Sequence, residues 1–239
     1  MIEPLAPRLD ALPEAQRRLW PALQPLLALG FVLYGGTAIS LRLGHRQSVD
    51  FDFFTDQPLD TRILQSQVPW LANATVLQEA PDTLTMLAHT PTAGVSRATA
   101  QETVKVSFFG GLSFGRLADP DVTSDAVAQI ASLEDLLATK LKALLQRVEA
   151  KDYLDIAALL GAGASLDRGL AGARALYGQA FQPAECLKAL VYFQGGDLGT
   201  LSVDIRDELT RAVAATGPLP SVAVISHSLA LVGPQIGGA

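Results

Sequence analysis

The sequence has little cysteine, little positive charge and no long apolar run. Cys186 is the single cysteine, so no internal disulfide can form, which is typical of a protein kept in a reducing cytoplasm. The net charge is −6 and the pI is about 5.0, which excludes a broad basic surface for nucleic acid but not a local basic pocket. The apolar runs, including those of the C-terminal tail, are too short to cross a bilayer, so we expect no membrane segment.

Other absences narrow the function classes further. The N-terminal stretch MIEPLAPRLD carries Glu and Pro where a signal peptide has a basic start and an apolar core, so we expect a cytoplasmic protein. Ser107 has no nearby Asp–His set that would indicate a hydrolase triad, and Cys186 lies in an apolar helical run that predicts a buried thiol. We find no internal repeat and no low-complexity linker.

The composition nevertheless supports a folded core. The chain has 239 residues, of which 49% are hydrophobic and 18% charged, enough for one large domain or two small ones. Short apolar or alternating runs predict strands at 31–34, 48–55, 74–80, 83–89 and 102–109. Helical patterns lie at 13–30, where Pro21 and Pro25 interrupt the run, and at 37–43 before Gly44. A third runs from about Leu59 to about Val68.

The pattern changes after residue 118. From there the chain is rich in Ala and Leu at helical spacing, and Ser132 followed by Asp135 resembles a capping box. We therefore expect an α/β (α+β) protein with an α/β domain over 1–118 and an all-helical domain over 119–239.

Two aspartates interrupt the run SVDFDFFT. In a strand, Asp50 and Asp52 point to the same face, roughly 6.5 Å apart at their α-carbons, while Phe51 and Phe53 point to the other. Two such carboxylates repel unless a cation lies between them, and Mg²⁺ prefers carboxylate oxygens and bridges to phosphates. The alternative is a solvated edge strand whose carboxylates face water.

A glycine pair precedes these aspartates. In LYGGTAISL, Gly35 and Gly36 end a strand, and a helix begins near Thr37. Glycines allow the backbone to approach a phosphate closely, and the first amides of a helix point at the anion. The combination predicts a phosphate cradle beside a metal site, with Arg46 and Ser48 on the approach. An ordinary tight turn is the alternative.

These residues resemble a known family. LYGG followed by DFD resembles the signature of the DNA polymerase β-type nucleotidyltransferase superfamily. The blocks GGTAISLRLGHRQSVDFDFF and LEDLLATKLKALLQRVEAKDYLDI together resemble the AbiEii/AbiGii toxin nucleotidyltransferases over residues 25 to 200. The resemblance implies a small mixed sheet that carries the aspartates, with flanking helices, and a helical domain that closes the nucleotide cleft.

The second block supplies cations and further acids. Lys140, Arg147 and Lys151 follow a spacing that predicts one stripe of a single helix, with Lys142 off the stripe and facing solvent. A salt-bridged surface, with Lys151 paired to Asp155, is the alternative. The resemblance implies that Lys140 contacts phosphates and that Asp152 acts as a base or orients the nucleophile.

One position departs from the superfamily pattern. The superfamily places a third carboxylate on a later strand, and VKVSFF is the candidate strand here. By alternation Lys105, Ser107 and Phe109 share one face, and none of them is acidic. We expect weak binding of a second metal ion and slow turnover or inactivity, unless Asp152 or Asp155 compensates or one metal ion suffices.

The expected reaction is transfer of a nucleoside monophosphate from an NTP to an acceptor hydroxyl, with Mg²⁺ (or Mn²⁺) bound by Asp50 and Asp52. The resemblance implies an RNA acceptor, such as a tRNA end, and a cognate antitoxin. The alternative is a catalytically weak or inactive nucleotide-binding module that acts through a protein partner.

Overall fold

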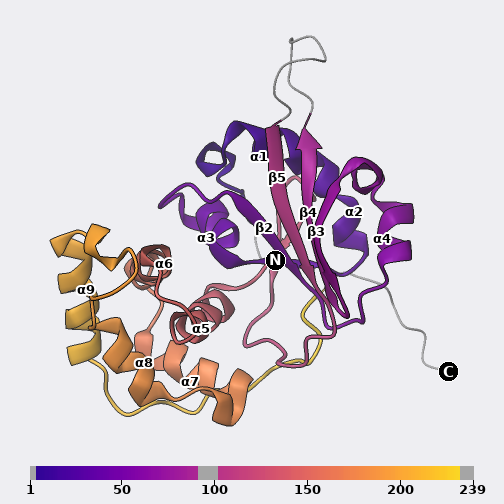
Figure 1. Cartoon of the computed structure of the whole chain (residues 1–239). Coiled ribbons are helices and arrows are strands. Elements are labelled where there is room, and N and C mark those ends of the chain that lie inside the picture. The colour runs from indigo at the N-terminus through magenta and orange to yellow at the C-terminus, as the bar shows by residue number, and fades with distance from the viewer. Residues whose placement is uncertain (1–3, 91–101, 232–239) are drawn as a thin grey trace. The chain divides into compact units, whose positions relative to one another are not determined.

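The computed structural model describes residues 4–90 and 102–231, and these fall into two compact units (Figure 1). Unit 1 takes in Met1–Ser113, Asp119–Ala131 and Ser228–Ala239, and unit 2 takes in Phe114–Ala118 and Ser132–His227. The chain therefore passes between the units several times. This division differs from the single boundary that the composition suggests after residue 118.

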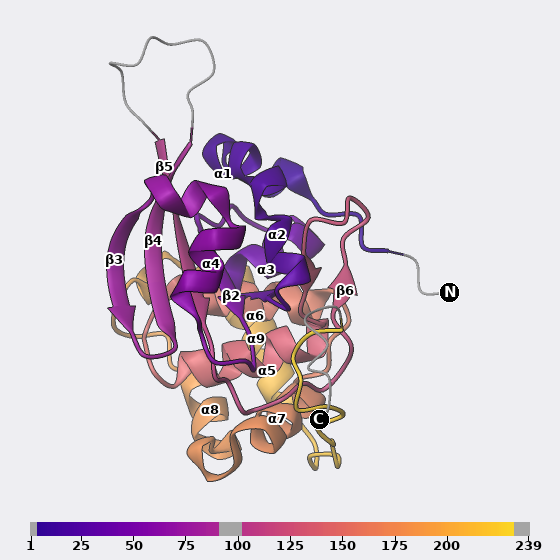
Figure 2. The same ribbon diagram turned by 90° about the vertical axis from the view of Figure 1, so that its right-hand side faces the viewer.

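Unit 1 is built on a mixed sheet, which has seven strands in the described residues and the order β3-β4-β5-β2-β1-β7-β6. Strands β2 and β5 pair in parallel, as do β1 and β7, and the remaining neighbours are antiparallel. Figure 2 shows β3, β4 and β5 side by side, with β6 away from them. The strands are β1 (Val32–Tyr34), β2 (Asp50–Phe54), β3 (Thr75–Ala80), β4 (Thr83–Thr90), β5 (Glu102–Phe109), β6 (Asp121–Val122) and β7 (Gln129–Ile130).

The alternation of β2 produces one apolar face and one polar face. Phe51 and Phe53 are buried, and Phe51 packs against Trp20 with ring centroids 6.1 Å apart. Phe108 of β5 lies beside Phe53 on this face, with centroids 6.0 Å apart. Burial of these rings on one side leaves Asp50 and Asp52 on the other side, as the alternation predicts.

The helices of unit 1 follow the breakers in the sequence. Pro21 and Pro25 divide the first helical run into α1 (Glu14–Leu19), a 3₁₀ turn and α2 (Pro25–Ala28). Helix α3 (Gly35–Leu43) ends at Gly44, which has the left-handed φ of 65° that favours glycine. Helix α4 (Thr61–Gln67) begins after Asp60, whose carboxylate accepts the amides of Arg62 and Ile63.

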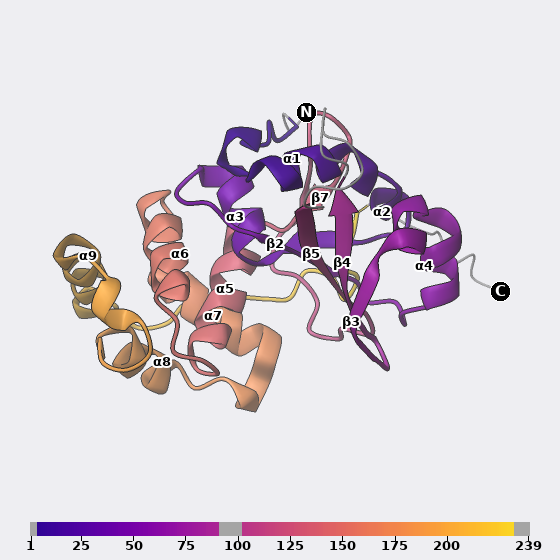
Figure 3. The same ribbon diagram turned by 45° about the horizontal axis from the view of Figure 1, so that its top comes forward.

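Unit 2 is helical, as expected for this part of the chain. Its helices are α5 (Leu133–Leu144), α6 (Ala150–Gly161), α7 (Leu166–Tyr177), α8 (Pro183–Leu190) and α9 (Val203–Ala214), which Figure 3 shows together. Ser132 caps α5 by accepting the Asp135 amide. The Asp135 carboxylate accepts the amides of Leu117 and Ala118, so it fixes the segment 114–118 to α5.

Two expectations about the elements are wrong. Residues 119–131 lie in a stretch expected to be helical, but they contain β6 and β7 and belong to unit 1. The block from Lys140 to Lys151 is also not one helix. Helix α5 ends at Leu144, Arg147 lies in the connection, and Lys151 belongs to α6. The stripe predicted from continuous helical spacing therefore does not exist.

Fold class is confirmed: the protein has a mixed sheet with flanking helices and a separate helical unit.

Candidate functional site

The turn between β1 and α3 is shaped by its two glycines. Gly35 has φ of +74°, and a Cβ at this position would lie 2.6 Å from Oδ2 of Asp52. A Cβ on Gly36 would collide with the Arg46 guanidinium and lie 3.0 Å from Oγ of Ser48. Any larger residue would therefore displace the very groups predicted for the site. Helix α3 also begins without a side-chain cap on its first amides.

The polar face of the sheet brings β2 and β5 residues side by side. The register pairs Asp50 with Lys105 and Asp52 with Ser107. Nζ of Lys105 lies 2.9 Å from Oδ2 of Asp50, and both side chains are partly exposed, at 41% and 31%. Ser107 is buried, and its hydroxyl accepts a hydrogen bond from Thr85 at 3.4 Å. The place opposite Asp52 is therefore taken by a neutral group, as the alternation predicts.

Three other predicted residues lie around this turn. The Thr37 side chain is buried, and its hydroxyl donates to the carbonyl of Asp50, which ties α3 to β2. Ser48 is buried too. The Arg46 guanidinium lies at Gly36 and donates to the carbonyl of Gln47 at 2.9 Å. The structure thus gathers all the predicted residues of the first block around one turn and one strand.

No group of three or more Asp, Glu, His or Cys side chains arranged to hold a metal ion occurs within residues 4–90 and 102–231. The two carboxylates of β2 are the acids that the strand offers. On β5 the positions beside Asp50 and Asp52 are occupied by Lys105 and Ser107, so neither of them adds a third acid.

A buried ionic cluster lies in unit 2. Nζ of Lys140 is 2.8 Å from Oδ1 of Asp152 and 2.6 Å from Oδ2 of Asp155. Both aspartates are fully buried, and the Lys140 side chain is 6% exposed. These charged side chains can be buried because the Lys140 ammonium pairs with both carboxylates and donates a hydrogen bond to that of Asp152.

Arg147 completes this cluster from the connection between α5 and α6. Its Nε donates to Oδ2 of Asp152 at 2.7 Å and its Nη2 donates to Oδ1 at 3.0 Å. Burial alone would raise the pKa of Asp152, but the hydrogen bonds from Arg147 and the charge of Lys140 outweigh it, so the pKa is lowered. Both carboxylate oxygens are thus engaged by cations.

The remaining charges of the block differ from the expectation. Lys151 pairs with Glu149 at 2.8 Å, whereas Asp155, its partner in the salt-bridged alternative, pairs with Lys140. Lys142 was expected to face solvent, but it is half-buried, with its Nζ on the Ala180 carbonyl and 5.8 Å from the centre of the Tyr177 ring. Arg147 and Lys151 are the more exposed cations of the block, at 45% and 48%.

Sequence reasoning missed two of these partnerships. Alternation predicts the face on which Lys105 lies, but its ion pair with Asp50 depends on which strand lies beside β2. The salt-bridged alternative pairs Asp155 with Lys151, because i, i+4 spacing within one helix favours that pair. The real partner of Asp155 lies in the preceding helix, and no local spacing indicates this.

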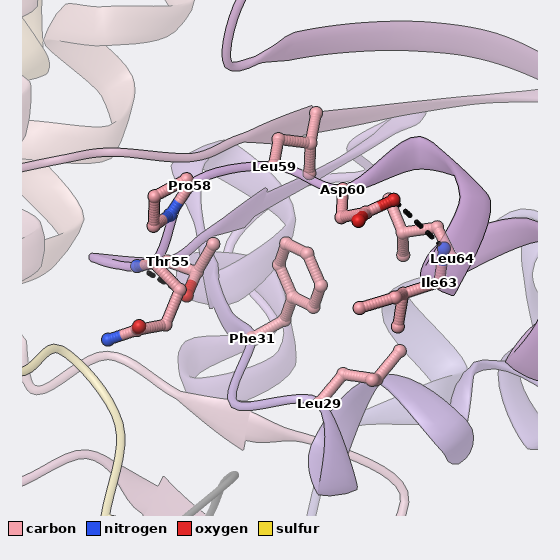
Figure 4. Close-up of a pocket in the computed structure, with 9 residues that line it drawn as sticks. Leu29, Phe31, Thr55, Pro58, Leu59, Asp60, Ile63 and Leu64 are labelled. Atoms are coloured by element: carbon pink, nitrogen blue, oxygen red, sulfur yellow. Dashed lines mark hydrogen bonds between the residues drawn. The ribbon is translucent and has the colours of Figure 1, made fainter. Parts of the chain in front are cut away.

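A small apolar pocket lies in unit 1, apart from the predicted site residues (Figure 4). Its volume is about 110 Å³. It opens beside the end of β2, where Phe31, Pro58 and Leu64 form part of its wall, and Asp60 at its rim caps α4. None of the predicted metal or phosphate residues lines it.

Among the described residues, every helix is too short or too polar to serve as a membrane span.

Comparison with solved structures supports the fold. The crystal structure of an antigenic nucleotidyltransferase-like protein from Paracoccidioides brasiliensis superposes with a TM-score of 0.53 and 16% sequence identity. The match covers 85% of this chain and 95% of that one. At this identity the likeness concerns the fold alone.

Two sequence comparisons add to this likeness in fold. The chain is 33% identical over 141 residues to the uncharacterized protein aq_aa25 of Aquifex aeolicus (strain VF5), a match that spans 56% of this chain and 62% of that protein. The family model described as "Nucleotidyl transferase AbiEii toxin, Type IV TA system" matches residues 18–213, which include the glycine turn, the β2 aspartates and the Lys140 cluster. The chain therefore belongs to the AbiEii nucleotidyltransferase toxin family, as the resemblance of its two motif blocks predicts.

Proposed function

We propose that this chain is a divalent-metal-dependent nucleotidyltransferase that moves a nucleoside monophosphate from an NTP to an acceptor hydroxyl. The observation that carries the proposal is the close contact between the β1–α3 turn and β2. Gly35 lies against the Asp52 carboxylate, and Thr37 holds the Asp50 main chain. A phosphate cradle and a pair of carboxylates therefore share one small region of unit 1.

The carboxylate pair fits a hard divalent cation. Asp50 and Asp52 share one face of β2, and Lys105 neutralises one of their two charges. Mg²⁺ or Mn²⁺ would be held by these two side chains together with phosphate oxygens. When bound, such an ion offsets the charge that develops on the phosphates during transfer.

The residues of the turn have distinct roles in this proposal. The amides of Gly35 and Gly36 at the start of α3 bind phosphate oxygens, where the helix dipole favours negative charge. Arg46 adds a cation at Gly36, with Ser48 beside it. Thr37 is a positioning residue, because its hydroxyl is already bound to Asp50.

In unit 2 we assign charge neutralisation to Arg147 and Lys151, which are partly exposed. Asp152 holds Arg147 in place, and Lys140, which is buried between the carboxylates of Asp152 and Asp155, holds Asp152. Asp152 is poorly suited to act as a base, because cations engage both its oxygens and lower its pKa. We propose instead that Asp152 orients the side chains of Lys140 and Arg147, which donate hydrogen bonds to it.

The proposed step is a displacement at the α-phosphorus of the NTP. The acceptor oxygen forms a bond to the α-phosphorus while the bond from that phosphorus to the bridging oxygen of the β-phosphate breaks. Pyrophosphate leaves with the bonding electrons, and the acceptor proton passes to solvent. Positioning and charge compensation supply most of the catalysis in such displacements.

We further propose a cognate antitoxin, which the description of the family as part of a type IV toxin–antitoxin system supports. We also propose an RNA acceptor, such as a tRNA end. The net charge of −6 restricts RNA contact to local cations such as Arg46 and Arg147. The buried, unpaired Cys186 is consistent with action in a reducing cytoplasm.

The deciding experiment is incubation of the purified protein with each labelled NTP, Mg²⁺ or Mn²⁺, and total cellular RNA. We expect label to enter RNA, and Asp50→Asn or Asp52→Asn to reduce this by at least a hundredfold. Asp10→Asn is the matched control, since Asp10 is a surface aspartate paired with Arg8. Label incorporation that is equal in all four proteins would contradict the proposal.

A second candidate function is a nucleotide-binding module that acts through a protein partner without turnover. Ser107, which stands where the superfamily places an acid, favours it. Metal-dependent NTP binding by the wild type, with no label in RNA or in any other acceptor, is the result that would support this candidate.

A further inference from the structure

The ion pair between Lys105 and Asp50 bears on how many metal ions the polar face of β2 can hold. Strands β2 and β5 run in parallel, so Lys105 stands directly beside Asp50, and its Nζ lies 2.9 Å from Oδ2. A side-chain ammonium at this distance occupies a coordination position that a cation would otherwise use.

The charges on this face favour a single ion. Asp50, Asp52 and Lys105 together carry a net charge of −1 at neutral pH, and Ser107 adds none. The Arg46 guanidinium beside the glycine turn adds one positive charge, so the groups of the site sum to zero. One divalent ion brings this sum to +2, which suits a triphosphate. A second ion would bring it to +4 and would meet the Lys105 ammonium as a like charge within a few ångströms.

Ser107 does not supply the missing ligand. It is 4% exposed, and its hydroxyl already lies within hydrogen-bonding reach of Thr85 on β4. Lys105, by contrast, is partly exposed and its charged end reaches the carboxylate. The only cation that the described residues bring to Asp50 in a resolved ion pair is therefore a lysine of the neighbouring strand.

We propose that Lys105 takes the place of a second metal ion, so that this protein binds NTP with one divalent cation and a fixed lysine. The inference rests on the proposed function and refines it. Lys105 is a positioning residue: it holds the Asp50 carboxylate and supplies a permanent positive charge on the side where a second ion would bind.

The test counts ions rather than turnover. Mn²⁺ is titrated into the full chain with an NTP whose α- and β-phosphates are joined by a methylene group, and free Mn²⁺ is measured by electron paramagnetic resonance. We expect one Mn²⁺ per bound nucleotide in the wild type. Lys105→Gln should bind Mn²⁺ about tenfold more tightly, because one neighbouring positive charge is lost.

Lys105→Glu provides the sharper variant, since it places a third carboxylate on the face and should raise the count to two. Lys188→Glu is the matched control, because Lys188 forms an ion pair of equal length with Glu185 in unit 2. We expect this control to keep one Mn²⁺. Partly exposed positions such as 105 tolerate these changes, and circular dichroism checks the fold.

Two Mn²⁺ per nucleotide in the wild type, or one in Lys105→Glu, would overturn the inference while leaving the proposed nucleotidyltransferase intact. A wild type that binds no nucleotide at any Mn²⁺ concentration would remove the proposed function, and the inference with it.

Discussion

Gly35 shows how much one backbone position contributes at the residue scale. Its φ of +74° is strained for any residue with a Cβ, and that Cβ would lie 2.6 Å from the Asp52 carboxylate. Strain and collision are separate effects, and a second glycine allows them to be measured separately. Gly163 has φ of +94° with nothing within 4 Å of its missing Cβ.

We predict that Gly35→Ala lowers the free energy of unfolding and also weakens metal-dependent NTP binding at least tenfold, because Asp52 must move. Gly163→Ala should cost about 1–2 kcal/mol of stability from backbone strain and leave NTP binding unchanged. Urea unfolding and nucleotide titration measure the two effects. Equal NTP affinity in both variants would show that Asp52 tolerates the displacement.

The buried Asp152 gives a second residue-scale prediction. Asp152→Asn leaves Lys140 and Arg147 with less compensation, so we expect a loss of about 3–5 kcal/mol at pH 6. The pKa of Asp152 is lower in the folded chain than its ordinary value of 3.8. Its ionised form therefore stabilises the fold above pH 3.8, and this contribution is lost as the pH falls through the lower folded value.

The stability difference between wild type and Asp152→Asn should consequently shrink as the pH is lowered from 6 towards 3. Urea unfolding at several pH values measures it. Asp135, whose pKa is raised by burial, contributes with the opposite sign in both proteins and cancels in the difference. A difference that stays constant with pH would mean that the carboxylate charge is not what the cluster uses.

At the scale of elements, local pattern predicted most of unit 1 and failed where tertiary contacts decide. The Asp-Phe alternation predicted both faces of β2, and the glycines predicted the bounds of α3 within two residues. The break after Leu144 carries no Gly or Pro. In the connection that follows this break, Arg147 donates a hydrogen bond to Asp152 of the next helix. The periodicity of the sequence does not predict such a contact.

The two-residue strands β6 and β7 escaped prediction for a related reason. A strand of two residues is too short to show an alternation of apolar and polar residues. Residues 129–130 form a strand because they pair with β1. The candidate site shows the same limit: the sequence predicts residues that lie together around the β1–α3 turn, but not partners across strands or helices, such as Lys105 for Asp50.

The reactivity of the Cys186 thiol reports how readily helix α8 opens. The Cys186 side chain is buried, and burial raises the pKa of the thiol to about 12. We predict that Ellman's reagent reacts very slowly with the native chain at pH 8 and with one equivalent in unfolding concentrations of urea. Fast reaction without urea would show that α8 opens readily, independently of the rest of unit 2.

At the scale of the whole molecule, the interleaved segments matter most. β7 pairs with β1, so a fragment of residues 1–118 lacks a strand that lies inside the sheet order. Further contacts come from the far end of the chain, where the amide of Leu229 donates to Asp56 and that of Leu231 to Gln129. Unit 1 is therefore not a contiguous piece of sequence.

We predict that the 1–118 fragment shows no cooperative urea transition, whereas a 1–131 fragment, which regains β6 and β7, shows at least a partial one. Circular dichroism follows both. A cooperative transition of equal midpoint in the two fragments would mean that β7 adds nothing to the sheet.

The same interleaving sets an order on synthesis. Many multidomain proteins complete an N-terminal domain on the ribosome before the next one emerges. Here the Asp56 carboxylate accepts hydrogen bonds from Ser228 and Leu229, and these residues are translated only after all of unit 2. A nascent chain thus carries the β2 aspartates long before the last contacts of their unit form, and the finished nucleotidyltransferase fold is reached late in translation.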